Sequence, residues 1–336
     1  MGRVTLTDRH VDPKVAALMA GTMVWDNHGC MPLRPGDDEF LPQLERYRKA
    51  GVDVASLNVG FDLAWEGTHL VLAHYRHWIR RHPEHYLLVE SVADVHRAKA
   101  EGKLGVTFDV EGGLALHGQL AMVQLLYDLG VRWMLFAYNR NNDLGGGCQD
   151  DDHGLTKFGR QVLDEMARVG MVTCCSHTGL RTTMDIMEHS RNPVIFSHSN
   201  PLGMWKHRRN VADEAIKACA KTGGVVGING IGEFLGKSTR SETVARHVDY
   251  VAQLVGTEHV GFGIDYVFDR KELNDWLASR PDLFPPEDGY AEGIKIVDPE
   301  QMPEIAECLL KLGYSDEQLQ GILGGNHLRV AAQVWK

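Results

Sequence analysis

Two kinds of hydrophobic pattern alternate along the chain. Short apolar runs typical of buried strands are followed by longer segments whose apolar residues recur every three or four positions, as in amphipathic helices. The predicted strands are residues 23–28, 52–59, 105–110, 131–138, 171–176, 193–200, 225–229 and 260–264. Eight strands that alternate with helices over about 240 residues predict an α/β fold of the (β/α)8 barrel type, which typically has about 250 residues.

Helical periodicity occupies the segments between these strands and continues beyond the last one. The predicted helices are residues 11–19, 40–50, 69–81, 92–101, 114–129, 156–169, 180–190, 210–222, 242–255, 299–312, 316–321 and 326–335. Residues 266–297 are rich in Pro, Asp and Trp and are expected to form a loop. Because no stretch has linker composition, we expect residues 1–336 to form a single barrel domain, with a helical segment before it and helices after it.

A doubly wound open sheet is the alternative fold. Such a sheet usually has five or six strands and a glycine-rich phosphate-binding turn after the first strand. Here the first predicted strand ends in DNHGC, and no GxGxxG motif follows it. The number of strands and the missing turn favour the barrel.

Composition excludes several classes of partner. The formal net charge of −10 argues against nucleic-acid binding, which requires clustered Lys and Arg. No run approaches the roughly 20 apolar residues of a transmembrane helix, and the first residues lack the apolar core of a signal peptide. The six cysteines form no CxxC pair, which argues against zinc ribbons and thioredoxin-type motifs. We therefore expect a cytoplasmic protein that acts on a small molecule, with a homodimer left open.

Five side chains able to bind metal or transfer protons stand where predicted strands stop: His28, Glu111, His177, His198 and Asp265. In a barrel, the carboxyl ends of the strands meet at one mouth, where active sites lie. Each residue alone has a structural alternative, since strand-end histidines often only make hydrogen bonds and Asp265 or Glu111 could cap a turn. Their joint occurrence favours a site for zinc, manganese or iron. Glu111 is the natural bridge between two ions that clamp a nucleophilic hydroxide.

The motifs that contain these residues resemble those of one known family, nearly from end to end. The motifs are DNHGCMPL (DGHNDLP in the family), FDVEGG (IEGG), CCSHTG (DLSHVS), VIFSHSN (nearly verbatim), RRNVADE (RRNVPDD), GFGIDY (GGDFDG) and GGNHLRV (GGNxLRV). The segment from NRNND to HGLTKFGRQVLDEMARVGM resembles the family's long fourth loop and its helix. The chain thus resembles the membrane (renal) dipeptidases, the zinc-dependent M19 peptidases among the amidohydrolase-like barrels, as a divergent bacterial-type member.

The resemblance implies a metallohydrolase that cleaves dipeptides, or a small carboxylate-bearing amide, through a metal-bound hydroxide. It implies two zinc ions, with His28 on the first, Glu111 bridging both at the catalytic centre, and His177 and His198 on the second. Cys30 stands where the family has a second aspartate ligand for the first ion. A thiolate also binds zinc, so two outcomes stay open: Cys30 replaces the aspartate on the first ion, or the first site is weak.

The resemblance also assigns the residues around the metals. Arg209 would hold the substrate carboxylate through its planar guanidinium, and Asp265 would move the proton from water to the leaving amine. Tyr138 stands where the family has a histidine that stabilises the oxyanion, so a neutral phenol donor is expected to contact substrate there. Asn229 stands where an aromatic residue often contacts substrate, and Val267 replaces the second aspartate of the GGDFDG motif.

These departures leave two other functions open. One is a divergent amidohydrolase-like tailoring enzyme that acts on a specialised metabolite. The other is a catalytically impaired homologue that binds a ligand or partner at the former active site.

Overall fold

The computed structural model describes residues 12–61, 65–290 and 293–336, so position 11 of the first expected helix lies outside it. The strands are β1 Trp25–Cys30, β2 Val54–Phe61, β3 Tyr86–Leu88, β4 Leu104–Glu111, β5 Val131–Leu135, β6 Val172–Cys174, β7 Val194–Ile195, β8 Val226–Ile228, β9 Val260–Phe262 and β10 Tyr266–Val267. The α-helices are α1 Pro13–Gly21, α2 Glu45–Lys49, α3 Trp65–Arg81, α4 Val92–Ala100, α5 Met122–Asp128, α6 Lys157–Val169, α7 Leu180–His189, α8 Asp213–Lys221, α9 Ser241–Val255, α10 Arg270–Ser279, α11 Met302–Lys311, α12 Asp316–Gln320 and α13 Asn326–Val334.

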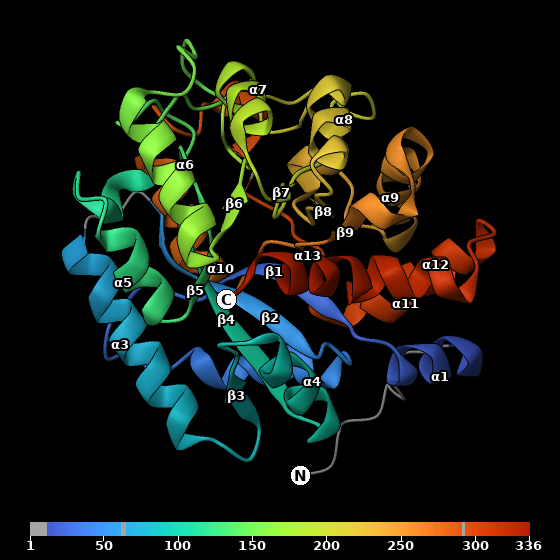
Figure 1. The fold of residues 1–336 in the computed structure, drawn as a ribbon. Coiled ribbons are helices and arrows are strands. Elements are labelled where there is room, and N and C mark those ends of the chain that lie inside the picture. Colours follow the sequence, from blue (N-terminus) through green and yellow to red (C-terminus); the bar gives the residue numbers. More distant parts are fainter. Residues whose placement is uncertain (1–11, 62–64, 291–292) are drawn as a thin grey trace.

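Eight parallel strands form the barrel, in the order β7, β6, β5, β4, β2, β1, β9 and β8. A parallel bridge between Phe196, just after β7, and Val226 joins the two ends of this order and closes the barrel. Helices follow the strands and surround them (Figure 1). The predicted (β/α)8 barrel is therefore confirmed, and the carboxyl ends of the strands meet at one mouth.

Three local predictions were wrong. β3, which pairs with the first half of β4, was not expected, because three residues are too few for a periodic signal. The single helix expected at 114–129 is broken, because His117 and Gly118 have φ values of +49° and +67°, which no right-handed helix accommodates. The loop expected at 266–297 contains α10, whose first turn is capped by Asp269 through a 2.9 Å hydrogen bond from the Glu272 amide.

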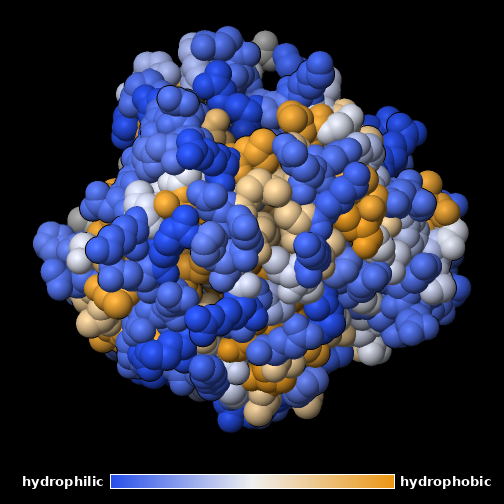
Figure 2. Space-filling view, turned by 45° about the horizontal axis from the view of Figure 1, so that its top comes forward, coloured by the Kyte–Doolittle hydropathy of each residue, from blue (hydrophilic) through white to orange (hydrophobic). Residues whose placement is uncertain are grey.

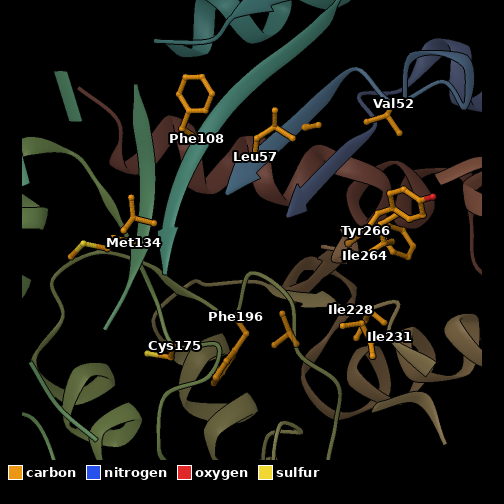
Figure 3. Packing of buried hydrophobic residues seen from close by; sticks show 14 of the residues in the cluster. Val52, Leu57, Phe108, Met134, Cys175, Phe196, Ile228, Ile231, Ile264 and Tyr266 are labelled. Carbon is orange, nitrogen blue, oxygen red and sulfur yellow. The ribbon is translucent and has the colours of Figure 1, made fainter. Parts of the chain in front are cut away.

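Polar and apolar residues alternate along the barrel strands. On β4, Phe108 and Val110 belong to the buried apolar layer, and Figure 3 shows Phe108 beside Leu57 of β2. Asp109, between them, points the other way, into the barrel, and lies within hydrogen-bonding distance of side chains from β1 and β2. Period-two alternation thus gathers polar side chains inside the barrel near its mouth.

The end of β7 packs very closely against its neighbours. A Cβ atom added to Gly227 would lie 2.2 Å from the carbonyl oxygen of Ser197, and one added to Gly263 would lie 1.9 Å from the same atom. No side chain fits at either distance, so glycine is required at both positions. These two glycines, in β8 and just after β9, allow the backbone before His198 to approach both of these strands closely.

The molecular surface is mostly hydrophilic on the face seen in Figure 2, with hydrophobic groups scattered among the hydrophilic residues. In the part of the chain that the structure describes, none of the helices has both the length and the apolar character needed to cross a membrane.

Candidate metal centre and substrate pocket

Three imidazoles from different strand ends surround one carboxylate oxygen. Oε1 of Glu111, the last residue of β4, lies 3.7 Å from Nε2 of His28, 3.5 Å from Nε2 of His177 and 3.3 Å from Nε2 of His198. The Nε2 atoms of His177 and His198 are 2.9 Å apart. All four side chains are buried. The barrel therefore brings β1, β4, β6 and β7 together at a single point, as the strand-end pattern predicted.

The His28 ring is oriented from inside the barrel. Its Nδ1 atom lies 3.3 Å from Oδ1 of Asp109, whose other carboxylate oxygen accepts a 2.7 Å hydrogen bond from the hydroxyl of Ser56. Asn58 donates a further hydrogen bond of 3.1 Å to Asp109. A carboxylate behind an imidazole fixes its ring and raises the basicity of the opposite nitrogen, the arrangement common behind metal-bound histidines.

His177 and His198 are oriented in the same way by neutral partners. Nδ1 of His177 lies 2.7 Å from Oδ1 of Asn139, and Nδ1 of His198 lies 2.8 Å from Oγ of Ser197. Because the Nδ1 atoms are occupied, the Nε2 atoms are left to face Glu111. The sequence patterns gave no sign of these supporting roles, although Asp109 stands two residues before Glu111, on the same face of its strand.

A second group lies beside the first and shares His28 with it. Sγ of Cys30 is 3.5 Å from Nε2 of His28 and 3.7 Å from Oδ1 of Asp265, and Oδ1 of Asp265 is 3.4 Å from the same imidazole nitrogen. The ligand atoms of these three residues lie within 4.8 Å of one another, as do those of His28, Glu111 and His198. Cys30 thus belongs to a group of side chains close enough together to hold an ion.

Backbone conformation at the mouth is unusual. Asn139, His177 and Asp265 have φ values of +60°, +63° and +58°, in the left-handed region that non-glycine residues rarely adopt. Such conformations persist only where the surrounding structure holds them, and they are common at functional sites. Here they occur at one of the three imidazoles, at its hydrogen-bond partner and at the candidate proton carrier.

Burial dominates the electrostatics of the centre. It raises the pKa of the Glu111 carboxyl to about 8 and that of the Cys30 thiol to about 12. Burial lowers the pKa values of His177 and His198 well below their usual range, and the nearby guanidinium of Arg209 adds to both effects. The imidazoles of His177 and His198 are thus neutral and have lone pairs to offer, whereas the carboxylate and thiolate forms need a nearby cation. Burial would also lower the pKa of His28, but the charges of Cys30, Asp109 and Glu111 outweigh it and raise that pKa well above its usual range.

The residues present fit a divalent transition metal. Oε1 of Glu111 is buried and has no hydrogen-bond partner among the described residues, although three imidazole nitrogens face it. Buried polar atoms normally have partners, so this oxygen indicates an absent positive group. Imidazole, thiolate and carboxylate are also the ligands preferred by zinc and its neighbours in the first transition row.

A cavity of about 190 Å³ lies over the centre, and Cys30, Glu111, His177 and Asp265 form its floor. Arg209 lies in its wall with the side chain buried, and Nη2 has no hydrogen-bond partner in the described part of the chain. An unpaired buried guanidinium is well suited to an anionic ligand.

Of the two other predicted substrate contacts, one lines the cavity and one does not. Tyr138 lines the cavity, and its ring stacks on His177 with ring centroids 4.3 Å apart. Asn229, expected to contact substrate, is instead completely buried and does not line the cavity. Its Nδ2 donates to Asp265 and its Oδ1 accepts from the amide of Ile231, so neither amide atom is left for a substrate.

Comparisons with known proteins agree with this geometry. The family profile of the membrane dipeptidases, peptidase family M19, matches residues 43–283. An amidohydrolase from Pseudomonas aeruginosa is 29% identical, with 96% of this chain and 99% of that one covered and a TM-score of 0.85. The probable dipeptidase PvdM from Pseudomonas aeruginosa is 17% identical, with 96% and 97% covered and a TM-score of 0.79. A metallo peptidase from Rhodobacter sphaeroides, liganded with a phosphinate mimic of L-Ala-D-Ala, is 19% identical, with 94% and 100% covered and a TM-score of 0.75.

Proposed function

We propose that this chain, which belongs to the membrane dipeptidase family, peptidase family M19, hydrolyses the amide bond of a dipeptide or a small amide with a free carboxylate. Membership of the family makes the chain a dipeptidase-like metallohydrolase. The observation that carries this proposal is the position of Glu111 among three inward-facing imidazoles, beneath a cavity whose wall holds the unpaired guanidinium of Arg209. Glu111 with the imidazoles suits a divalent metal, and the guanidinium suits a carboxylate.

We propose zinc as the metal and two ions as the number. His28 and Cys30 would hold the first ion, His177 and His198 the second, and Glu111 would contact both. When bound, such ions polarise the scissile carbonyl and lower the pKa of the attacking water. Asp109, Asn139 and Ser197 keep the three imidazoles oriented toward them.

Asp265 is the proposed proton carrier. Its Oδ1 atom faces the centre, 3.4 Å from Nε2 of His28, whereas Oδ2 is held by a 2.9 Å hydrogen bond from Nδ2 of Asn229. Oδ1 can take a proton from the attacking water and deliver it to the amine nitrogen as the C–N bond breaks. Asn229 is therefore a positioning residue for Asp265.

Arg209 and Tyr138 complete the proposed machinery. The Arg209 guanidinium would bind the substrate carboxylate and thereby place the scissile carbonyl over the centre. Burial, with the charges of Glu111 and Asp265, raises the pKa of Tyr138 well above its usual range, so its hydroxyl keeps its proton. A protonated phenol at the cavity wall can donate a hydrogen bond to the oxygen that gains charge in the transition state.

A dipeptide panel tests the proposal. Zinc-loaded protein should cleave L–L or L–D dipeptides. Glu111→Gln should lower kcat/KM by at least about a hundredfold, because removing this carboxylate from the centre costs several kcal/mol of transition-state stabilisation. Glu66→Gln, at an exposed position on α3, is the matched control and should retain activity. If the protein binds two metal ions but cleaves no dipeptide or small amide, the proposal is contradicted. The chain would then be a homologue that binds a ligand without cleaving it.

The alternative substrate is a specialised metabolite, and the mostly apolar walls of the cavity favour it. Cleavage of an amide in such a compound, with no turnover of the dipeptides, would identify this function. The cytoplasmic location, the homodimer and the single domain over residues 1–336 stay predictions from the sequence.

A further inference from the structure

One wall of the cavity is made of apolar side chains that the centre itself does not need. Leu273, Trp276 and Leu277 stand three and four positions apart, so they lie on one face of α10, and all three line the cavity. Trp276 contacts Phe61 and Phe284, with ring centroids 5.0 Å and 4.7 Å apart. We call these five residues the apolar wall. Its size and aromatic content suit a bulky hydrophobic group.

Phe61, at one end of the apolar wall, and Arg209 arise from opposite sides of the barrel. The other four wall residues follow β10, and among them Trp276 contacts Phe61. Phe61 ends β2, and Arg209 lies in the connection between β7 and α8. In the closed order of eight strands, β2 and β7 are four strands apart in both directions. A substrate whose carboxylate pairs with Arg209 would therefore extend across the metal centre and place the acyl side of its amide against Phe61 and Trp276 of the apolar wall.

The two acidic residues beside the apolar wall are already paired. Nη1 of Arg34 lies 2.7 Å from Oε2 of Glu272 and 3.3 Å from Oδ2 of Asp269. The other oxygen of Asp269 caps α10. An α-ammonium group at this end of a substrate would need a carboxylate partner, because a buried charge without one is costly.

The remaining carboxylates offer no better partner. Among the described residues that line the cavity, the only other acids are Glu111 and Asp265, and both belong to the metal centre. Asp265 also gives one oxygen to Asn229. The acyl side of the cavity is thus apolar and has its charges paired.

We propose that the substrate is an N-acyl amino acid whose acyl group is bulky, apolar and uncharged, rather than a dipeptide with a free amino terminus. This inference rests on the proposed function and narrows its substrate class. In the reaction, the water oxygen bonds to the acyl carbon, the C–N bond breaks, and the amine nitrogen receives a proton. The products are a hydrophobic carboxylic acid and a free amino acid.

A matched substrate pair tests the proposal. 3-Phenylpropanoyl-alanine differs from Phe-Ala only in lacking the α-amino group, and both are assayed on the zinc-loaded protein with L- and D-alanine. We expect kcat/KM to be at least about tenfold higher for the acyl compound, because the cavity leaves the ammonium group unpaired. Equal or faster cleavage of Phe-Ala would overturn the proposal.

Variants show whether the apolar wall causes the preference. Trp276→Ala should lower kcat/KM for 3-phenylpropanoyl-alanine about tenfold and leave acetyl-alanine nearly unchanged, because only the larger acyl group reaches the tryptophan. Trp205→Ala, at an exposed tryptophan that does not line the cavity, is the control and should change neither. Arg34→Met should raise the relative rate on Phe-Ala, since it frees Asp269 and Glu272. An unchanged substrate ratio in both Trp276→Ala and Arg34→Met would overturn the assignment of the wall.

A binding measurement separates this proposal from the proposed function. If no amide is cleaved, the hydrolase assignment fails, but calorimetry can still compare 3-phenylpropanoate with phenylalanine on the zinc-loaded protein. Tighter binding of 3-phenylpropanoate by about tenfold or more, weakened in Trp276→Ala, would support the apolar acyl site independently of turnover. Equal binding, or tighter binding of phenylalanine, would overturn it.

Discussion

Asn229 donates a 2.9 Å hydrogen bond from its Nδ2 atom to Oδ2 of Asp265, whose backbone has a φ of +58°. This bond fixes the carboxylate so that Oδ1 faces the centre. In Asn229→Ala the carboxylate can rotate, so we expect kcat to fall ten- to a hundredfold while KM changes little. Steady-state kinetics on a cleaved substrate measures both constants.

Metal content and thermal stability distinguish positioning from a general structural effect. Asn229→Ala should bind as much metal as the unchanged protein and unfold cooperatively. An unchanged kcat would contradict the positioning role, and loss of metal in parallel with kcat would show that Asn229 supports the ligands instead.

Cys30 is expected to bind metal through its sulfur. Sγ lies 3.5 Å from Nε2 of His28. Burial raises the pKa of the thiol to about 12, so a bound cation must displace its proton. Protein loaded with Co²⁺ should show a near-ultraviolet sulfur-to-cobalt charge-transfer band, which Cys30→Ser should abolish.

Cys308→Ser is the matched control, because this cysteine lies on α11 and does not line the cavity. It should retain the full band. A band of undiminished intensity in Cys30→Ser would exclude sulfur coordination by Cys30.

Arg209 is expected to act on the substrate carboxylate alone. Its side chain is buried, and its guanidinium carbon lies 5.3 Å from the centre of the Phe234 ring, which restricts its movement. Arg209→Ala should lower kcat/KM for a free-carboxylate substrate by about a hundredfold, the value of strong charge-assisted hydrogen bonds. The carboxamide of the same substrate should be cleaved at nearly the same rate by both proteins.

The neighbouring Arg208 provides the control, since its guanidinium pairs with Asp288 at 2.7 Å and does not line the cavity over the metal centre. Arg208→Ala should affect both substrates little. A similar loss for carboxylate and carboxamide in Arg209→Ala would contradict carboxylate recognition.

His327 is expected to make the fold sensitive to acid. Burial lowers its pKa from 6.5 to about 4, and its Nε2 donates a 3.1 Å hydrogen bond to the carbonyl oxygen of Phe262. The unfolded chain binds the proton more readily than the folded one. The contribution of neutral His327 to the free energy of unfolding is therefore complete above about pH 6.5 and is lost as the pH falls toward 4. The thermal midpoint should therefore decrease across this window, by roughly 5–10 °C.

His327→Gln retains an amide donor but does not titrate, so its midpoint should depend less on pH between 6.5 and 4. His77→Gln, on the exposed face of α3, should behave like the unchanged protein. Identical pH profiles for all three proteins would refute the role of His327.

The alternation of strands and helices and the strand-end positions of the candidate site residues could be predicted because both depend on local sequence. VIFSHSN shows an apolar strand that stops at His198, and CCSH does the same for His177. Since all barrel strands are parallel, residues at their carboxyl ends must meet, whatever the details of packing. The pattern alone therefore located the mouth and most of the candidate metal-binding side chains gathered there.

Other features had no local signal. His117 has a backbone conformation that breaks a helix although the surrounding apolar spacing is helical. Asn229 stands at a strand end like the ligands, yet its side chain turns to Asp265 rather than to the cavity. Such outcomes depend on which neighbours a side chain finds after the strands have assembled.

The amino-acid sequence by itself determined the alternation of strands and helices, the family, and the strand-end positions of the candidate metal-binding residues, because short-range periodicity and motifs encode these. Only the tertiary structure decided the partners of those residues, the apolar wall and the pairing of Arg34 with Asp269, which are 235 residues apart. Burial, hydrogen bonding and charge pairing between distant segments arise only when the chain closes into a barrel, so no local pattern contains them.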